Sequence, residues 1–309
     1  MRRSWQTRMN GLHIWQKLLI LGGVFALLFA IPTSLYFGQV ASELARTARE
    51  ADGLGRSETA LGLLRALSRH RSLAAGFLAG DASLSAARDE AAAAVESRLA
   101  ALRNDRRTGP RAQGLLAKAN TAWKALAEGV KGKVISGGDS NASHQELIAG
   151  AGAALEALLD QDGLAVDPDT TIHYSVRAAL IHVPELLESL GQAQAQGMAL
   201  LGAKSGGQED RESISGVLLR AKERDAEMRA AIRKVFAHSD ELKTALAPAL
   251  LEADAALNKV FKSVRVDVMF SQDLARGAGD FHGELEQALD AQARLSARLL
   301  AEVRTRLMD

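Results

Sequence analysis

The chain of 309 residues contains no cysteine, only 5 proline residues and only 4% aromatic residues. The absence of cysteine excludes a disulfide framework and a thiolate metal site. The chain is rich in alanine, leucine, glutamate and arginine and poor in the β-branched and aromatic residues that favour sheets. No segment shows the alternating pattern of a strand, so the composition predicts an all-α fold.

Signatures of catalysis and of cofactor binding are also missing. We find no nucleophile elbow, no phosphate-binding glycine loop and no close carboxylate pair suited to acid–base chemistry. The 7 histidines include no HExxH motif and no closely spaced pair on one helix face. No basic stripe is interleaved with aromatic residues, as nucleic-acid binding would require. The sequence therefore predicts no enzyme activity, no cofactor, no metal site and no nucleic-acid partner.

The net charge of +1 conceals an asymmetry at the N-terminus. Residues 1–17 carry +4, from Arg2, Arg3, Arg8 and Lys17, so the rest of the chain carries −3. No charged residue occurs between Leu18 and Ser42. The apolar part of this segment, 18–37, would be roughly 30 Å long as a helix, which is enough to cross a bilayer core.

This pattern predicts a transmembrane helix over 18–40. The basic segment 1–17 places the N-terminus in the cytoplasm and residues 41–309 in the periplasm, with the helix in a bacterial inner membrane. A cleaved signal peptide is the alternative interpretation. Against it, the apolar core exceeds the usual length of about 7–15 residues, and Gln39-Val40-Ala41 lacks a small residue at its first position.

Beyond the span the hydrophobic periodicity is helical throughout. Ser143-His-Gln-Glu146 matches a capping box, and Gly/Ser/Asn-rich or acidic stretches predict loops at 135–143, 160–167 and 205–212. The predicted helices run from the membrane span to about residue 80 and then over 82–104, 111–130, 143–159, 168–203, 212–238, 240–270 and 272–307. Residues 41–309 would form an antiparallel bundle, which could comprise two four-helix modules, 41–160 and 161–309.

The segment VDPDTTIHYSVRAALIHVPELL opens the second half. Asp167 is the expected N-cap, Pro168 takes the first helical position, and Asp169 favours the positive end of the helix dipole. Pro184 lies inside the same predicted helix and should bend it. The bend could simply wrap the helix around its neighbours, or its freed carbonyls and widened groove could help to form a ligand pocket.

His70 and Arg71 are the strongest candidates for ligand binding. Both continue an apolar stripe into the bundle interior, where an unpaired charge is costly. Each needs an acidic side chain, a water cluster or an anionic ligand, and Arg71 could hold a carboxylate or a nitrogen oxyanion. Internal pairing is the alternative. Tyr174 and Arg177 lie one turn apart and form either a second ligand surface or a solvated face, and Trp123 is expected in the bundle core.

Two stretches resemble the extracytoplasmic sensor regions of bacterial methyl-accepting chemotaxis proteins, and of related transmembrane histidine kinases and diguanylate cyclases. The first is SRHRSLAAGFLAGD, through His70 and Arg71. The second is DPDTTIHYSVRAALIHVPELLESLGQAQAQG, in which the matching residues are Asp167, Pro168, Asp169, Tyr174, Pro184, Leu190, Gly191 and Gly197. The sequence departs from the family pattern at Thr171, His173 and Arg177, which puts the family's ligand specificity in doubt here.

The resemblance implies a membrane-anchored four-helix-bundle sensor that binds a small molecule and signals as a homodimer. No second apolar run of 18 or more residues follows, so we expect signal output from a separately encoded cytoplasmic partner or loss of the output half. The alternative function is a membrane-tethered helical scaffold without a ligand.

Overall fold

The computed structural model describes residues 13–308, and all secondary structure in that range is helical. This confirms the all-α prediction. The chain divides into two compact units, Met1–Ala48 and Arg49–Asp309.

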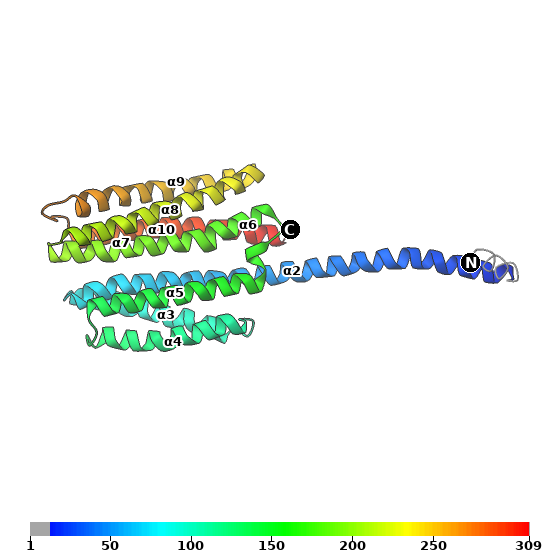
Figure 1. The fold of residues 1–309 in the computed structure, drawn as a ribbon, viewed down its shortest axis with the longest axis horizontal. Helices are drawn as coiled ribbons and strands as arrows, with labels where there is room; N and C mark the ends of the chain where they lie inside the picture. The colour runs from blue at the N-terminus through cyan, green and yellow to red at the C-terminus, as the bar shows by residue number, and fades with distance from the viewer. Residues whose placement is uncertain (1–12, 309) are drawn as a thin grey trace. The chain divides into compact units, whose positions relative to one another are not determined.

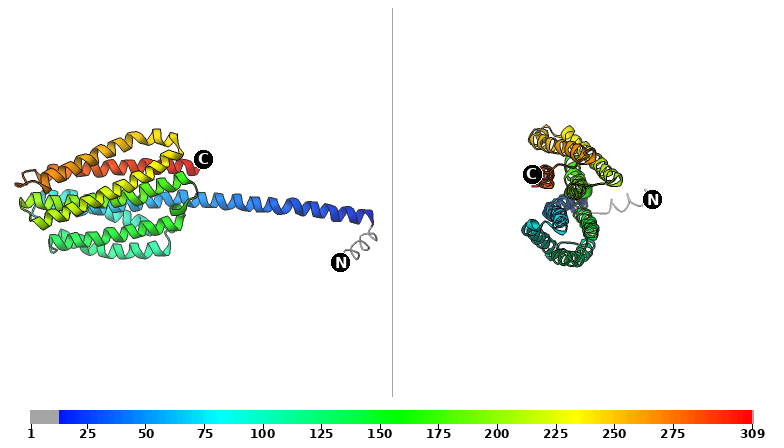
Figure 2. Two further views of the ribbon diagram at one scale, coloured as in Figure 1. Left: turned by 45° about the horizontal axis from the view of Figure 1, so that its top comes forward. Right: turned by 90° about the vertical axis from the view of Figure 1, so that its left-hand side faces the viewer.

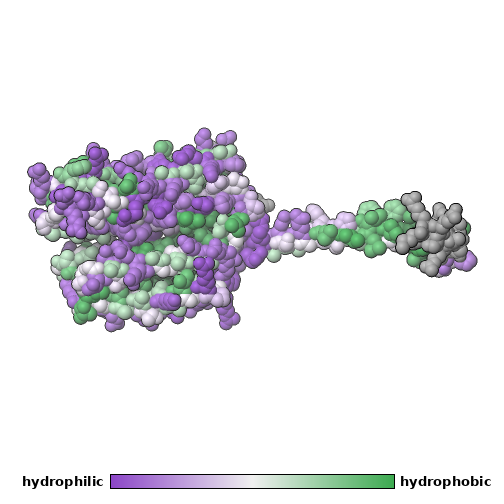
Figure 3. Space-filling view, viewed as in Figure 1, coloured by the Kyte–Doolittle hydropathy of each residue, from purple (hydrophilic) through white to green (hydrophobic). Residues whose placement is uncertain are grey.

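The first unit contains the N-terminal part of helix α2 (Ile14–Leu78). The large apolar side chains along this part of the helix are exposed, as the green stretch in Figure 3 shows. They are Ile14, Trp15, Leu18, Leu19, Ile20, Leu21, Val24, Phe25, Leu27, Leu28, Phe29, Ile31, Leu35, Tyr36 and Phe37. This helix is long and apolar enough to cross a membrane. Of the predicted cytoplasmic segment 1–17, residues 1–12 lie outside the described residues.

The second unit contains the rest of α2 and all later helices (Figure 1). These are η1 (Ala82–Leu84), α3 (Ser85–Asn104), α4 (Pro110–Lys131), α5 (Gly137–Asp162), η2 (Leu164–Val166), α6 (Thr170–Arg177), η3 (Ala178–His182), α7 (Val183–Ala203), α8 (Gln208–His238), α9 (Asp240–Ser263), η4 (Val264–Met269) and α10 (Ala278–Met308). The views in Figures 1 and 2 show α3, α4 and α5 beside the C-terminal part of α2, and α6 to α10 as a second group.

The predicted starts of α5, α8 and α10 are wrong by about one to two turns. Helix α10 begins at Ala278, not at residue 272. Helix α5 begins at Gly137, not Ser143, because Ser136 is the N-cap: its hydroxyl accepts a hydrogen bond from the Asp139 N–H at 3.1 Å. The stretch 137–143 is rich in Gly, Ser and Asn, which predicts a loop. It is helical because tertiary packing, in which His144 is buried, outweighs that preference. Helix α8 likewise begins at Gln208, inside the predicted loop 205–212.

The N-cap of α6 is Asp169 rather than Asp167. The Asp169 carboxylate accepts hydrogen bonds from the N–H groups of Thr171 at 2.7 Å and Ile172 at 3.0 Å. Asp167 instead accepts the Asp169 N–H at 2.6 Å, which shapes the turn before the helix. Each acid therefore satisfies a different part of the same helix start, and Pro168 precedes the helix.

Pro184 is accommodated by a π-helical turn, η3, immediately before it. The Val183 N–H bonds to the Ala178 carbonyl, one residue further back than in an α-helix. Pro184 has no N–H, so the Ala179 carbonyl has lost both of its possible helical donors. The hydroxyl of Ser296, from α10, donates to this carbonyl at 3.0 Å. A neighbouring helix thus satisfies the carbonyl that the proline leaves open.

We predict that Ser296→Ala lowers the free energy of unfolding by about 1–3 kcal/mol, because it leaves the buried Ala179 carbonyl without a donor. The measurement is urea unfolding of the full chain in detergent, followed by circular dichroism. Ser72→Ala is the matched control, since Ser72 is also buried but donates to Arg69 within its own helix. Equal losses in the two variants would contradict this account.

Candidate functional site

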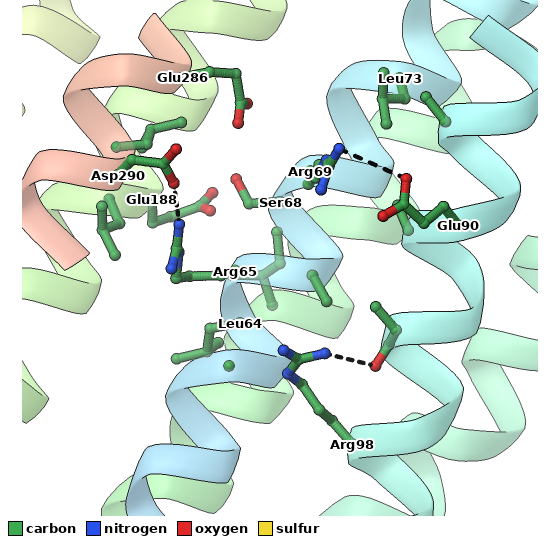
Figure 4. Close-up of a pocket in the computed structure, with 18 of the residues that line it drawn as sticks. Leu64, Arg65, Ser68, Arg69, Leu73, Glu90, Arg98, Glu188, Glu286 and Asp290 are labelled. Atoms are coloured by element: carbon green, nitrogen blue, oxygen red, sulfur yellow. Dashed lines mark hydrogen bonds and ion pairs between the residues drawn. The ribbon is translucent and has the colours of Figure 1, made fainter. Parts of the chain in front are cut away.

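A cavity of about 590 Å³ lies between α2, α3, α7 and α10 in the second unit (Figure 4). Its apolar lining includes Leu64, Leu73, Leu187 and Pro184. Charged side chains share the wall: Arg65 and Arg69 from α2, Glu90 and Arg98 from α3, Glu188 from α7, and Glu286 and Asp290 from α10. A volume of this size with a mixed lining suits a small polar ligand.

The three arginines of the cavity differ in how their charges are compensated. Arg65 pairs with Asp290, and Arg69 lies 4.0 Å from Glu90. Arg98 is half-buried, and its guanidinium donates to the Ala94 carbonyl at 3.3 Å. No carboxylate lies within ion-pair distance of Arg98 among the residues that the structure describes. Within the described part of the chain, Arg98 is therefore a cavity cation without an anionic partner.

The acidic side chains on α7 and α10 face the arginines from the opposite wall (Figure 4). Glu286 accepts a hydrogen bond from the Gln194 side chain at 3.2 Å. Glu188 is held from behind by Arg71. A ligand with an anionic group would consequently place that group near α2 and α3 and keep its uncharged part toward α7 and α10.

Arg71 lies behind the cavity wall. It is 1% exposed, and it donates to both carboxylate oxygens of Glu188, at 2.7 and 3.1 Å, and to the Ser68 hydroxyl at 3.4 Å. A Cβ atom at Gly191 would lie 2.7 Å from the Arg71 Nη2 atom and 2.4 Å from the Ser68 hydroxyl, so this packing requires glycine. Internal pairing, the alternative weighed for Arg71, is what the structure contains.

His70 belongs to a buried pair with His144 from α5. The His70 Nδ1 atom lies 2.8 Å from His144 Nε2, and His144 Nδ1 lies 2.7 Å from the Ser140 carbonyl. A carbonyl only accepts, so His144 carries its proton on Nδ1 and His70 donates to its Nε2. Trp123, buried as predicted, packs its ring edge to face with His70.

The histidine pair is uncharged at neutral pH. Burial lowers the pKa of His70 to about 3, helped by the charges of His144 and Arg88. Burial also lowers the pKa of His144 to about 4, against the hydrogen bond to Ser140. His70 therefore carries no positive charge that would attract an anionic ligand.

The second predicted ligand surface does not reach the cavity. The Tyr174 hydroxyl accepts a hydrogen bond from Lys234 at 2.9 Å, and the same ammonium group lies over its ring at 4.4 Å. Tyr174 lines a separate shallow hollow with Asp167 and Pro168, and Arg177 is exposed. Of the predicted positions, only Pro184 lines the large cavity.

The sequence reading missed Arg65, Ser68, Arg69 and Arg98, which line the cavity. Arg65 and Arg69 are four residues apart and so share one face of α2, next to the apolar stripe. That spacing could have revealed them, whereas nothing in the sequence places Arg98 of α3 opposite.

Comparisons with known proteins show a similar fold in a solved structure. No family model matches the chain, and no curated protein matches it. The solved structure of the NasR transcription antiterminator is similar, with a TM-score of 0.65 and 16% sequence identity over 90% of this chain and 74% of that one. At this identity the similarity shows the fold alone.

We predict that the stability of the protein falls as the pH is lowered from 7 to 5. The folded-state pKa values of His70 and His144 lie below the ordinary value of about 6.5, so the unfolded chain binds more protons in this range. The pair's contribution is complete above about pH 6.5 and is lost as the pH falls toward 4. The expected loss by pH 5 is on the order of 2–4 kcal/mol, measured by urea unfolding.

The double variant His70→Gln/His144→Gln should flatten this pH dependence. His238→Gln, which removes an exposed histidine, should leave it unchanged. A double variant with the pH dependence of the original protein would show that the pair is not buried and neutral.

Proposed function

We propose that this protein is a membrane-anchored sensor that binds a small anion in the cavity between α2, α3, α7 and α10. The observation that carries the proposal is Arg98, a half-buried cavity cation without a carboxylate partner among the described residues. Arg65 and Arg69 stand nearby in exposed ion pairs that a ligand can replace at little cost.

The ligand class follows from arginine chemistry. A guanidinium presents a planar fork of N–H donors that matches a carboxylate or a nitrogen oxyanion such as nitrate or nitrite. The acidic residues Glu188 and Glu286 on the opposite wall disfavour a large polyanion. A small, singly charged anion satisfies Arg98 without approaching those carboxylates.

The signalling route follows from helix α2. Arg65, Ser68 and Arg69 lie on α2, and the same helix carries the apolar run 18–37. A ligand that draws α2 toward α3 would shift it by an ångström or so relative to α7, a displacement of the kind used by helical switches. By analogy with chemoreceptors, the protein would act as a homodimer, and a separate cytoplasmic partner would respond to this shift.

We expect a small anion to raise the melting temperature of the full chain in detergent. At 100 times the Kd the rise should be roughly 5 °C. The panel is sodium nitrate, nitrite, formate, acetate and succinate, each against sodium chloride at equal ionic strength. Arg98→Gln should abolish the shift for the active anion.

Arg103→Gln is the matched control, because Arg103 lies on the exposed face of the same helix, outside the cavity. If no anion in the panel shifts the melting temperature, the scaffold function replaces the sensor. A shift that survives Arg98→Gln would place the ligand elsewhere.

The proposed location is the bacterial inner membrane, with the N-terminus in the cytoplasm and residues beyond about 40 in the periplasm. Because the chain has no cysteine, single introduced cysteines report topology cleanly. A membrane-impermeant maleimide added to intact spheroplasts should label Lys131→Cys, which is exposed on α4, and spare Ser4→Cys. The reverse labelling would overturn the orientation, and release of the chain in soluble form would indicate a cleaved signal peptide.

A further inference from the structure

Outside the cavity, one histidine and two glutamates converge at the end of the π-helical turn. His182 is the last residue of η3, Glu185 lies one turn later on α7, and Glu227 projects from α8. One ligand atom from each of the three lies within 4.8 Å of the others. The residues come from two packed helices, so the cluster bridges α7 and α8.

His182 is the observation that distinguishes this cluster from an ordinary group of surface acids. Its side chain is only 10% exposed, and its Nδ1 atom has no hydrogen-bond partner among the described residues. That nitrogen points at the carboxylates, 3.8 Å from Glu185 Oε2 and 3.7 Å from Glu227 Oε2. These separations are too long for hydrogen bonds. A buried, unsatisfied imidazole nitrogen is costly unless something binds it.

From this geometry we propose that His182, Glu185 and Glu227 form a binding site for a divalent transition-metal ion of the Zn²⁺ class. Two ligand atoms that bind Zn²⁺ at about 2.0–2.1 Å in a tetrahedral arrangement are about 3.4 Å apart. The two His182–glutamate separations are 3.7 and 3.8 Å, and the three ligand atoms all lie within 4.8 Å of one another. Rotation of the two carboxylate side chains, which are 42% and 47% exposed, can close these distances. One neutral imidazole and two carboxylates also balance the charge of a divalent ion.

The ligand set selects the type of ion. An imidazole nitrogen favours Zn²⁺ and its first-row neighbours over Mg²⁺ and Ca²⁺, which prefer oxygen ligands throughout. Three protein ligands leave the fourth tetrahedral position to solvent. The bound ion would join α7 to α8.

Arg224 is a built-in competitor for this site. Its guanidinium lies 2.7 Å from Glu227 and 3.5 Å from Glu185, on the oxygens that would bind the metal. The Arg224 side chain is 39% exposed, so it can swing into solvent when a metal ion arrives. Removing Arg224 should therefore tighten metal binding, whereas a purely structural ion-pair network would give no metal site to tighten.

The test is calorimetric titration of Zn²⁺ into the untagged, chelator-treated full chain in detergent, with Co²⁺ absorption as the spectroscopic measure. We expect one ion per chain, visible-range Co²⁺ bands and a higher melting temperature with Zn²⁺. His182→Gln should weaken binding on the order of 100-fold. Arg224→Ala should strengthen it roughly two- to fivefold.

Two further variants keep the result interpretable. Glu227→Gln changes a half-exposed side chain, so it should weaken metal binding without disturbing the fold. His238→Gln removes an exposed histidine from the end of α8 and should leave the affinity unchanged. Binding that persists in both His182→Gln and Glu227→Gln, or that is lost in His238→Gln, would overturn the proposed site.

Discussion

The π-helical turn, the contact between α7 and α10 and one wall of the cavity all depend on one constraint, the missing amide hydrogen of Pro184. A proline inside a helix supplies no N–H donor, and in the i to i−5 pattern of a π-helical turn the carbonyl that loses it lies five residues earlier, here that of Ala179. The chain responds with the π-helical turn η3, and α10 supplies the Ser296 hydroxyl to the Ala179 carbonyl. The proline itself lines the cavity. One local covalent feature thus fixes how α7 meets α10 and shapes a wall of the candidate site.

The ion pair between Arg71 and Glu188 links α2 to α7. Burying a guanidinium is costly unless its donors are satisfied, so the two-point contact with Glu188 favours one position of α2 against α7. The neutral histidine pair ties α2 to α5 without burying any charge. These polar contacts favour one register of α2 against both groups of helices, which apolar packing alone would specify less sharply.

How far the sequence predicts this structure depends on the range of the interactions involved. The helical class and the apolar run 18–37 are local patterns, and both are present as expected. The start of α5 was misplaced because the burial of His144 outweighs the loop preference of its neighbours. The inward position of Arg71 followed from periodicity. Its partner Glu188, 117 residues away, did not, since pairing across helices leaves no trace in one sequence. In the cluster at His182, the spacing to Glu185 is local, but nothing in the sequence places Glu227 of α8 beside them.

The arginines differ in burial, and this difference explains why a ligand would bind Arg65, Arg69 and Arg98 rather than Arg71. Arg71 is 1% exposed and is held by Glu188 through both terminal nitrogens, so an anion that took it from Glu188 would leave a carboxylate in a largely buried position. Arg65 and Arg69 are 42% and 51% exposed, and ion pairs in such positions contribute only about 0–1 kcal/mol. An anion could exchange with their partners and could also bind Arg98, which has no carboxylate partner within residues 13–308. In the proposed sensor, the buried arginine would hold the helices in place, and the more exposed arginines would bind the ligand.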